Sequence, residues 1–259
     1  MLWYKAWVET RFRFLLGVGA LTLLCAFFVV GHPFIVGQWA ADRLAHPEWT
    51  EPPWLPRAMV DYPFFVWHFL HGSLYQQVWA LFALLLAFGG IAREAEQGTM
   101  AFTLGLPVTR RRAEHVRAAV GGLEVAALGL LPALVVPLLS MALGKPYPVG
   151  HGLVHGALLV AGGLVFYAFG VWLAAAVRGE YTPVLVGLCA IALVYFVVQP
   201  YADDFAVAPL AVQLVNAPAV MAGPADLDAG LPWAGLALSL AVAAAFLFAA
   251  FRRTERQDF

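Results

Sequence analysis

Apolar stretches of about 20 residues with few or no charges recur along this sequence, and they constrain its fold more than any other feature. A helix of that length crosses the hydrocarbon core of a bilayer, because its backbone groups bond to one another. Six such windows cover residues 14–36, 73–91, 116–143, 152–177, 183–200 and 231–251. We therefore predict an all-α integral membrane protein with six transmembrane helices, formed by one transmembrane domain over residues 1–259.

The composition excludes a water-soluble globule. Hydrophobic residues make up 62% of the chain and charged residues 12%, whereas soluble domains are roughly half apolar and a quarter charged. The formal net charge of −1 provides no basic field that would attract nucleic acid. We expect membrane lipid, and no nucleic acid, among the partners of this chain.

Lysine and arginine are distributed unequally between the connections on the two sides of the predicted membrane. The larger set is Lys5, Arg11, Arg13, Arg93, Arg110, Arg111, Arg112, Arg117, Arg178, Arg252, Arg253 and Arg256, and the smaller set is Arg43, Arg57 and Lys145. Basic residues are retained on the cytoplasmic side during insertion. The asymmetry therefore predicts a multi-pass protein of a bacterial cytoplasmic (inner) membrane with both termini in the cytoplasm.

The first 13 residues have the pattern of a helix that lies in the membrane interface. Trp3 and Trp7 are four residues apart on one row of such a helix. Lys5, Glu9 and Arg13 form a second row with the same spacing. We predict an interfacial helix over residues 1–13 with its indoles toward lipid and its charges toward water.

Two long connections are predicted on the outer side. Residues 37–72 are rich in proline and aromatic residues, which favours a compact loop that caps the outer face. Residues 201–230 contain an apolar stretch at 205–221 that prolines interrupt. That stretch is too short to span a bilayer, and we predict a re-entrant or interfacial segment between spans five and six.

The cytoplasmic connection between spans two and three, residues 92–112, is predicted to form a short helix followed by a turn. Gly105 and Pro107 would end the helix, because glycine favours the left-handed backbone after a helix and proline cannot continue one. Thr109 is suited to cap the next helix, since its hydroxyl can accept from a free amide of the first turn. This arrangement, acidic before the turn and basic after it, fits the docking of a soluble partner.

Ten residues of this connection occur in the order of a family pattern. They are Glu94, Glu96, Gly98, Thr99, Leu104, Leu106, Pro107, Val108, Thr109 and Arg110. The segment resembles the cytoplasmic loop of type 2 ABC exporter permeases, and the six-span layout resembles the same family more loosely. The resemblance implies a cytoplasmic coupling helix in this loop, an N-terminal interfacial helix and a re-entrant outer element.

The resemblance also implies a permease subunit of an ABC transporter, in which a separate cytoplasmic ABC ATPase subunit hydrolyses ATP to move a substrate. The residues implied to contact that ATPase are Glu94, Glu96, Gly98, Thr99, Leu104, Pro107, Thr109 and Arg110. ATP and magnesium would bind the ATPase, so this chain would hold no cofactor and catalyse no reaction; the sequence contains no G-x-x-x-x-G-K-[ST] motif. A second copy of the chain, or a homologous permease, would complete the membrane part. Alternatively, the arginines only anchor the loop at the interface.

Glu124 is the carboxylate placed inside a predicted span. Placing an ionisable residue at that depth in a bilayer costs free energy, so such a residue marks a candidate functional site. It would line the translocation path, or it would form a structural bond with Arg117 or a neighbouring helix.

Histidines and small residues also occur at helical spacing. His68 and His71 are three residues apart and His151 and His155 four apart, a spacing that can place metal ligands on one face. No acidic or thiol residue accompanies them, so we expect locally bonded histidines and no metal site. Small residues at 118, 122 and 126 and at 152 and 156 predict close helix packing, within the chain or between two copies.

Two alternative functions remain open at the level of sequence. An ion-coupled secondary transporter would favour internal repeats and several buried carboxylates, of which Glu124 is one. An integral-membrane hydrolase would need a nucleophile, and Ser140 followed by His151 and His155 offers a serine–histidine pair, although no G-x-S-x-G motif is present.

Overall fold

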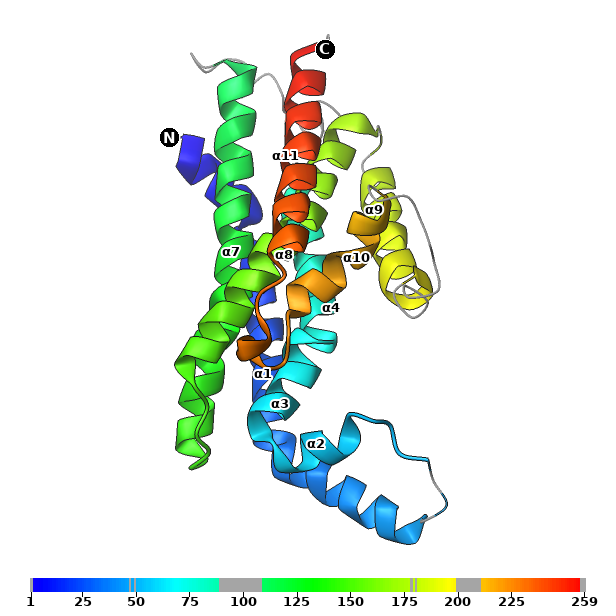
Figure 1. Cartoon of the computed structure of the whole chain (residues 1–259). Helices are drawn as coiled ribbons and strands as arrows, with labels where there is room; N and C mark the ends of the chain where they lie inside the picture. Colours follow the sequence, from blue (N-terminus) through cyan, green and yellow to red (C-terminus); the bar gives the residue numbers. More distant parts are fainter. Residues whose placement is uncertain are drawn as a thin grey trace.

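The described part of the chain is helical apart from its connections (Figure 1). The computed structural model describes residues 2–46, 48, 50–88, 109–177, 179, 181–198 and 211–256, without the side chains of residues 110, 197, 198 and 211–216. No strand occurs within these residues, so the prediction of an all-α fold is confirmed.

The helices differ widely in length. The long ones are α1 (Leu2–Ala45), α4 (Leu74–Ala87), α7 (Arg110–Ala142), α8 (Val149–Ala176) and α11 (Trp233–Arg256). The short ones are α2 (Leu55–Val60), α3 (Tyr62–Val66), the π-helix η1 (Trp67–His71), α9 (Thr182–Ala192), the π-helix η2 (Leu193–Val198), α10 (Ala211–Ala222) and the 3₁₀-helix η4 (Leu227–Ala229). Helices α3, η1 and α4 follow one another and together form one apolar stretch, Tyr62–Ala87.

Five helical stretches among the described residues are long and apolar enough to cross a membrane, as expected of a multi-pass protein. They are Leu2–Ala45, Tyr62–Ala87, Arg111–Ala142, Val149–Ala176 and Trp233–Arg256. They coincide with the first four predicted windows and the last, although the second stretch begins at Tyr62 rather than at residue 73. The predicted fifth window contains the shorter apolar helix Thr182–Phe196, so a sixth span stays a prediction.

Side-chain contacts define two ends of the helix bundle. Arg117 near the start of α7 contacts Glu9 of α1, and Arg111 contacts Glu255 at the end of α11. The starts of α1 and α7 therefore lie beside the ends of α4, α8 and α11, and we call this the terminal end, at the top of Figure 1. The opposite end, which holds α2, α3 and the turn between α7 and α8, is the distal end.

The helix directions require the chain to return to the distal end between α8 and α11. The last carbonyls of α8 accept hydrogen bonds from Arg253 near the end of α11, so both helices end together. Leu236 near the start of α11 packs in one apolar cluster with Leu158 in the first half of α8. Residues 177–232 therefore carry the chain back, and α9 and α10 are described parts of that return.

Two predicted segments differ in form from the prediction. Residues 2–13 form the first turns of α1 rather than a separate helix, since nothing between them and the first span breaks the helix; their position in the interface stays a prediction. Much of the predicted compact loop at 37–72 is also helical, as the end of α1 and as α2, α3 and η1. The reason is that Pro56 and Pro63 stand in the first turns of α2 and α3, where proline favours a helix.

Helix α10 lies inside the bundle. Gln76 of α4 donates its amide hydrogen to the Pro218 carbonyl, and the Trp67 indole donates to the Ala222 carbonyl at 3.2 Å. Met221 is fully buried. Of the predicted re-entrant stretch 205–221, the first six residues lie outside the described part, so its course relative to the membrane stays a prediction.

Glycines allow the central helices to approach one another closely. A Cβ at Gly156 of α8 would lie 3.0 Å from the Gly129 carbonyl of α7, and a Cβ at Gly152 would lie 3.1 Å from the Ala133 Cα. The small residues predicted at 152 and 156 therefore serve packing within the chain.

Candidate functional site

The ten residues of the family pattern, which include the predicted coupling residues, lie mostly outside the described part of the chain. This is the case for Glu94, Glu96, Gly98, Thr99, Leu104, Leu106, Pro107 and Val108, and for the side chain of Arg110. Thr109, which follows Val108, is described and has the role that the sequence predicts. It is the N-cap of α7, and its Oγ1 accepts from the Arg112 amide at 3.3 Å. Helix α7 therefore begins where its sequence predicts.

On the other side of the segment, Arg13 of α1 caps the end of α4. Its Nη1 donates to the carbonyl oxygens of Leu85 and Phe88, at 2.5 and 2.6 Å. These carbonyls belong to the last turn and the C-cap of α4, where the helix leaves acceptors unpaired and its dipole favours a cation. The helix that leads into residues 89–108 is thus fastened to α1.

A carboxylate of α1 contacts the first turns of α7. Glu9 Oε2 lies 3.7 Å from Nε of Arg117, while its Oε1 lies 3.5 Å from Nζ of Lys5. The side chain of Arg117 is mostly buried. Glu9 stays exposed, as predicted for this row of α1, whereas Arg13 is only half-exposed and turns its Nη1 to the α4 carbonyls, because helical spacing defines a face but not what covers it.

Glu124 is bonded to α1 and not to Arg117. Its side chain is buried, with a relative exposure of 4%, and Thr10 Oγ1 lies 2.5 Å from its Oε1. The other carboxylate oxygen has no hydrogen-bond partner among the described residues. The structural bond to a neighbouring helix is thus present, and a role of Glu124 in a translocation path stays a prediction.

We call Glu9, Thr10, Arg13, Arg117 and Glu124 the junction cluster. Its two carboxylates and two guanidinium groups balance in charge, which lowers the cost of holding them at a helix interface. The cluster joins α1 to the end of α4 and to the first half of α7. Sequence reasoning found Glu124 as a candidate site but gave no reason to connect it with Thr10 or Arg13.

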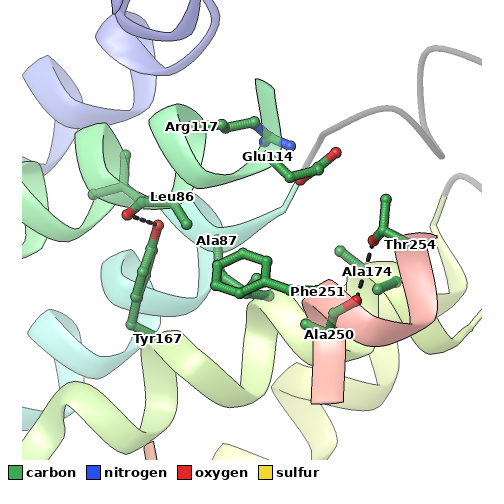
Figure 2. Close-up of a pocket in the computed structure, with 12 residues that line it drawn as sticks. Leu86, Ala87, Glu114, Arg117, Tyr167, Ala174, Ala250, Phe251 and Thr254 are labelled. Carbon is green, nitrogen blue, oxygen red and sulfur yellow. Dashed lines mark hydrogen bonds between the residues drawn. The ribbon is translucent and has the colours of Figure 1, made fainter. Parts of the chain in front are cut away.

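A pocket lies beside the junction cluster where α4, α7, α8 and α11 meet (Figure 2). Its empty space is about 480 Å³, part of it open to solvent. Glu114 and Arg117 line one side and Phe251 and Thr254 the other. Tyr167 also lines the pocket and donates to the Ala118 carbonyl at 2.8 Å. The pocket is a groove of mixed polarity at the terminal end.

The histidines do not form the pairs that their spacing in the sequence predicts. The rings of His71 and His155 stack with centroids 5.0 Å apart, and His71 is fully buried. His68 instead stacks on Trp54 at 4.3 Å. Nearly parallel rings do not direct their lone pairs at one ion, and the described residues contain no group of three or more ligand side chains that could hold a metal.

Ser140 is bonded to a tyrosine. Its Oγ lies 2.6 Å from the hydroxyl of Tyr62, and the serine is fully buried. Within the described residues no hydrogen bond joins Ser140 to His151 or His155. The serine–histidine pair that a hydrolase would require is therefore not assembled there.

Comparison with known proteins finds no protein-family model and no curated protein that matches this chain. The functional interpretation accordingly rests on the residues of the chain and on their arrangement.

Proposed function

We propose that this chain is the transmembrane permease subunit of an ABC exporter and couples ATP hydrolysis by a separate cytoplasmic ATPase to substrate movement. The observation that carries the proposal is the junction cluster. It fastens α1 to both helices that flank the predicted coupling segment, at the end of α4 and in the first half of α7.

A coupling segment transmits force only if the helices on either side of it are attached to the rest of the bundle. Arg13 holds the C-terminal end of α4, and Glu9 and Thr10 hold α7. The ion pair between Arg111 and Glu255, 3.3 Å apart, adds α11. A partner that displaces the segment would thus move several helices together, as rigid-body rocking requires.

The charge distribution supports a cytoplasmic position for the terminal end. Lys5, Arg13, Arg111, Arg117 and Arg253 all lie in helix turns at that end. Positive charge next to a span is retained in the cytoplasm, where an ATPase has access to ATP. Two ATPase subunits and a second permease copy or homologue would complete the transporter, with ATP and magnesium bound to the ATPase.

The test is affinity purification of the tagged protein in mild detergent from its native host. We expect a Walker-motif ATPase to co-purify and to hydrolyse ATP in a vanadate-sensitive manner. Gly98→Trp places a large side chain in the predicted coupling segment and should abolish co-purification. Gly150→Trp is the matched control, because a Cβ at Gly150, in the first turn of α8 at the distal end, meets nothing within 4 Å.

Two results would contradict the proposal. One is a preparation of this chain alone, without an ATPase, that still transports; it would favour the ion-coupled alternative. The other is equal loss of the ATPase in both tryptophan variants. It would mean that co-purification of the ATPase does not depend specifically on the predicted coupling segment.

A further inference from the structure

A cleft at the distal end has the chemistry of an amphiphile-binding site. It lies between the α2–α3 connection, the last turns of α7 and the turn that follows α7. The residues that line it are Val60, Asp61, Tyr62, Pro63, Pro137, Met141, Gly144, Lys145, Pro146, Tyr147, Pro148 and Val149. We call it the distal cleft. Prolines, aliphatic side chains and tyrosines make up most of its lining, and Lys145 is its one lysine or arginine among those residues.

The backbone of Lys145 is held in place by the end of α7. Gly144 has a left-handed φ of +67°, and its amide donates to the Met141 carbonyl at 3.1 Å. The amide of Lys145 donates to the Ser140 carbonyl at 2.9 Å. This pair of bonds is a Schellman motif, which glycine favours because it lacks a Cβ. The ammonium group is thus presented from a fixed backbone.

The ammonium group of Lys145 has neutral neighbours. Its Nζ lies 2.5 Å from Nδ1 of His32, which accepts, and 5.0 Å from the centroid of the Tyr62 ring. In the described part of the chain no carboxylate pairs with it. Asp61 also lines the cleft, and its Oδ2 forms an ion pair with Nε of Arg57 at 3.3 Å. Partial burial lowers the pKa of Lys145, a change that a bound anion would reverse.

Exposed apolar side chains continue from the distal cleft along α7. Met141, Leu138 and Leu134 are 72%, 64% and 67% exposed. Their spacing of three and four residues places them on one face of the helix. Because α7 lies in a candidate membrane span, this face is available to an acyl chain whose polar end lies at Lys145.

We propose that the distal cleft binds the phosphate headgroup of an anionic phospholipid, with Lys145 as the cation and the α7 face from Met141 to Leu134 in contact with an acyl chain. A lipid fits better than a free anion because the cation stands at the end of an apolar path. An anionic lipid fits better than a zwitterionic one because Lys145, the one lysine or arginine of the lining, has no carboxylate partner among the described residues and can pair with a net negative headgroup. The site does not depend on the proposed coupling to an ATPase.

The experiment is native mass spectrometry of the full chain in detergent with added dioleoyl phosphatidylglycerol or phosphatidylcholine. We expect the wild type to retain phosphatidylglycerol preferentially. Lys145→Gln should weaken the tightest binding event about tenfold, as expected for loss of one charge-assisted hydrogen bond. Lys145→Arg should retain it. Arg43→Gln is the matched control, since Arg43 pairs with Glu51 at the distal end and does not line the cleft.

Each other outcome would overturn the proposal. Unchanged phosphatidylglycerol binding in Lys145→Gln, or an equal loss in Arg43→Gln, would show that the lysine is an ordinary interfacial charge. Equal retention of phosphatidylcholine would exclude recognition of net charge. Displacement of the lipid by millimolar glycerol phosphate would identify a free phosphate as the occupant. Elution of each variant at the wild-type volume in size-exclusion chromatography establishes that the fold is retained.

Discussion

The bond between Thr10 and Glu124 shows how one buried carboxylate is accommodated between two apolar helices. The hydroxyl of Thr10 stands 3.1 Å from the Ala6 carbonyl and 2.5 Å from Oε1 of Glu124. A buried polar group that loses its partner retains its desolvation cost, whereas removal of both partners together is nearly neutral.

Thr10→Val should therefore destabilise the protein by about 1–3 kcal/mol, the cost of an unsatisfied buried group. The double variant Thr10→Val/Glu124→Leu should cost less than the sum of the two single variants. Unfolding free energies of the four proteins in mixed micelles provide the measurement. Strict additivity would mean that the two side chains do not interact.

The ion pair of Arg57 and Asp226 predicts a pH dependence at the distal surface. Arg57 donates to both carboxylate oxygens of Asp226, at 2.5 and 3.0 Å. These hydrogen bonds hold the pKa of Asp226 below its usual 3.8. A carboxyl whose pKa is lower in the folded state stabilises the fold above the unfolded pKa, and this contribution is lost as the pH falls through the folded value.

Asp226→Asn should accordingly lower Tm slightly between pH 5 and pH 7, and the difference from wild type should disappear as the pH falls through the folded pKa of Asp226, which lies below 3.8. The effect is small because both side chains are largely exposed and screened. Thermal unfolding measured across this pH range tests it, with Asp228→Asn as the control. A Tm difference that persists at the lowest pH would contradict the assignment.

At the scale of helices, Trp79 organises the contact between α4, α7 and α8. The indole Nε1 donates to the Val125 carbonyl of α7 at 3.1 Å. A Cβ at Gly163 of α8 would lie only 2.3 Å from Cζ3 of the indole. The fully buried tryptophan thus fits into a space that glycine leaves open.

Gly163→Ala should destabilise the protein by about 1–3 kcal/mol, because the indole is enclosed and cannot move away from an added methyl group. Gly19→Ala is the matched control, since a Cβ at Gly19 meets nothing within 4 Å in the middle of α1. That substitution should be neutral or stabilising by up to about 1 kcal/mol. Equal effects of both substitutions on Tm would contradict the packing role of Gly163.

At the scale of the whole molecule, the two ends of the bundle differ in charge. Basic side chains gather at the terminal end, while Arg43 and Arg57 at the distal end pair with the acidic residues Glu51 and Asp226. The helix directions place the start of α1 and the end of α11 at the terminal end. Retention of basic residues in the cytoplasm would orient the molecule with that end inside.

Reporter fusions test this orientation. Green fluorescent protein fused after residue 259 should fluoresce in bacterial cells, and alkaline phosphatase inserted after Lys145 should be active. Exchange of the two reporters should abolish both signals. An active phosphatase at the C-terminus would place the terminal end outside and remove the basis for ATPase contact there.

The amino-acid sequence by itself determined the features that depend on local chemistry. The apolar windows follow from the transfer of side chains into lipid, and all but one of them reappear as long helices. The capping role of Thr109 follows from a hydroxyl three residues before a free amide. Neither feature needs a partner from elsewhere in the chain.

Only the tertiary structure decided which faces meet. Helical spacing paired His71 with His68, but the fold stacks it on His155. The same spacing placed Arg13 toward water, but the fold directs it to the carbonyls of α4. A period of 3.6 residues defines a face and leaves its partner open. The partner depends on how the helices pack, and here the indole of Trp79 and the glycines opposite it set that packing.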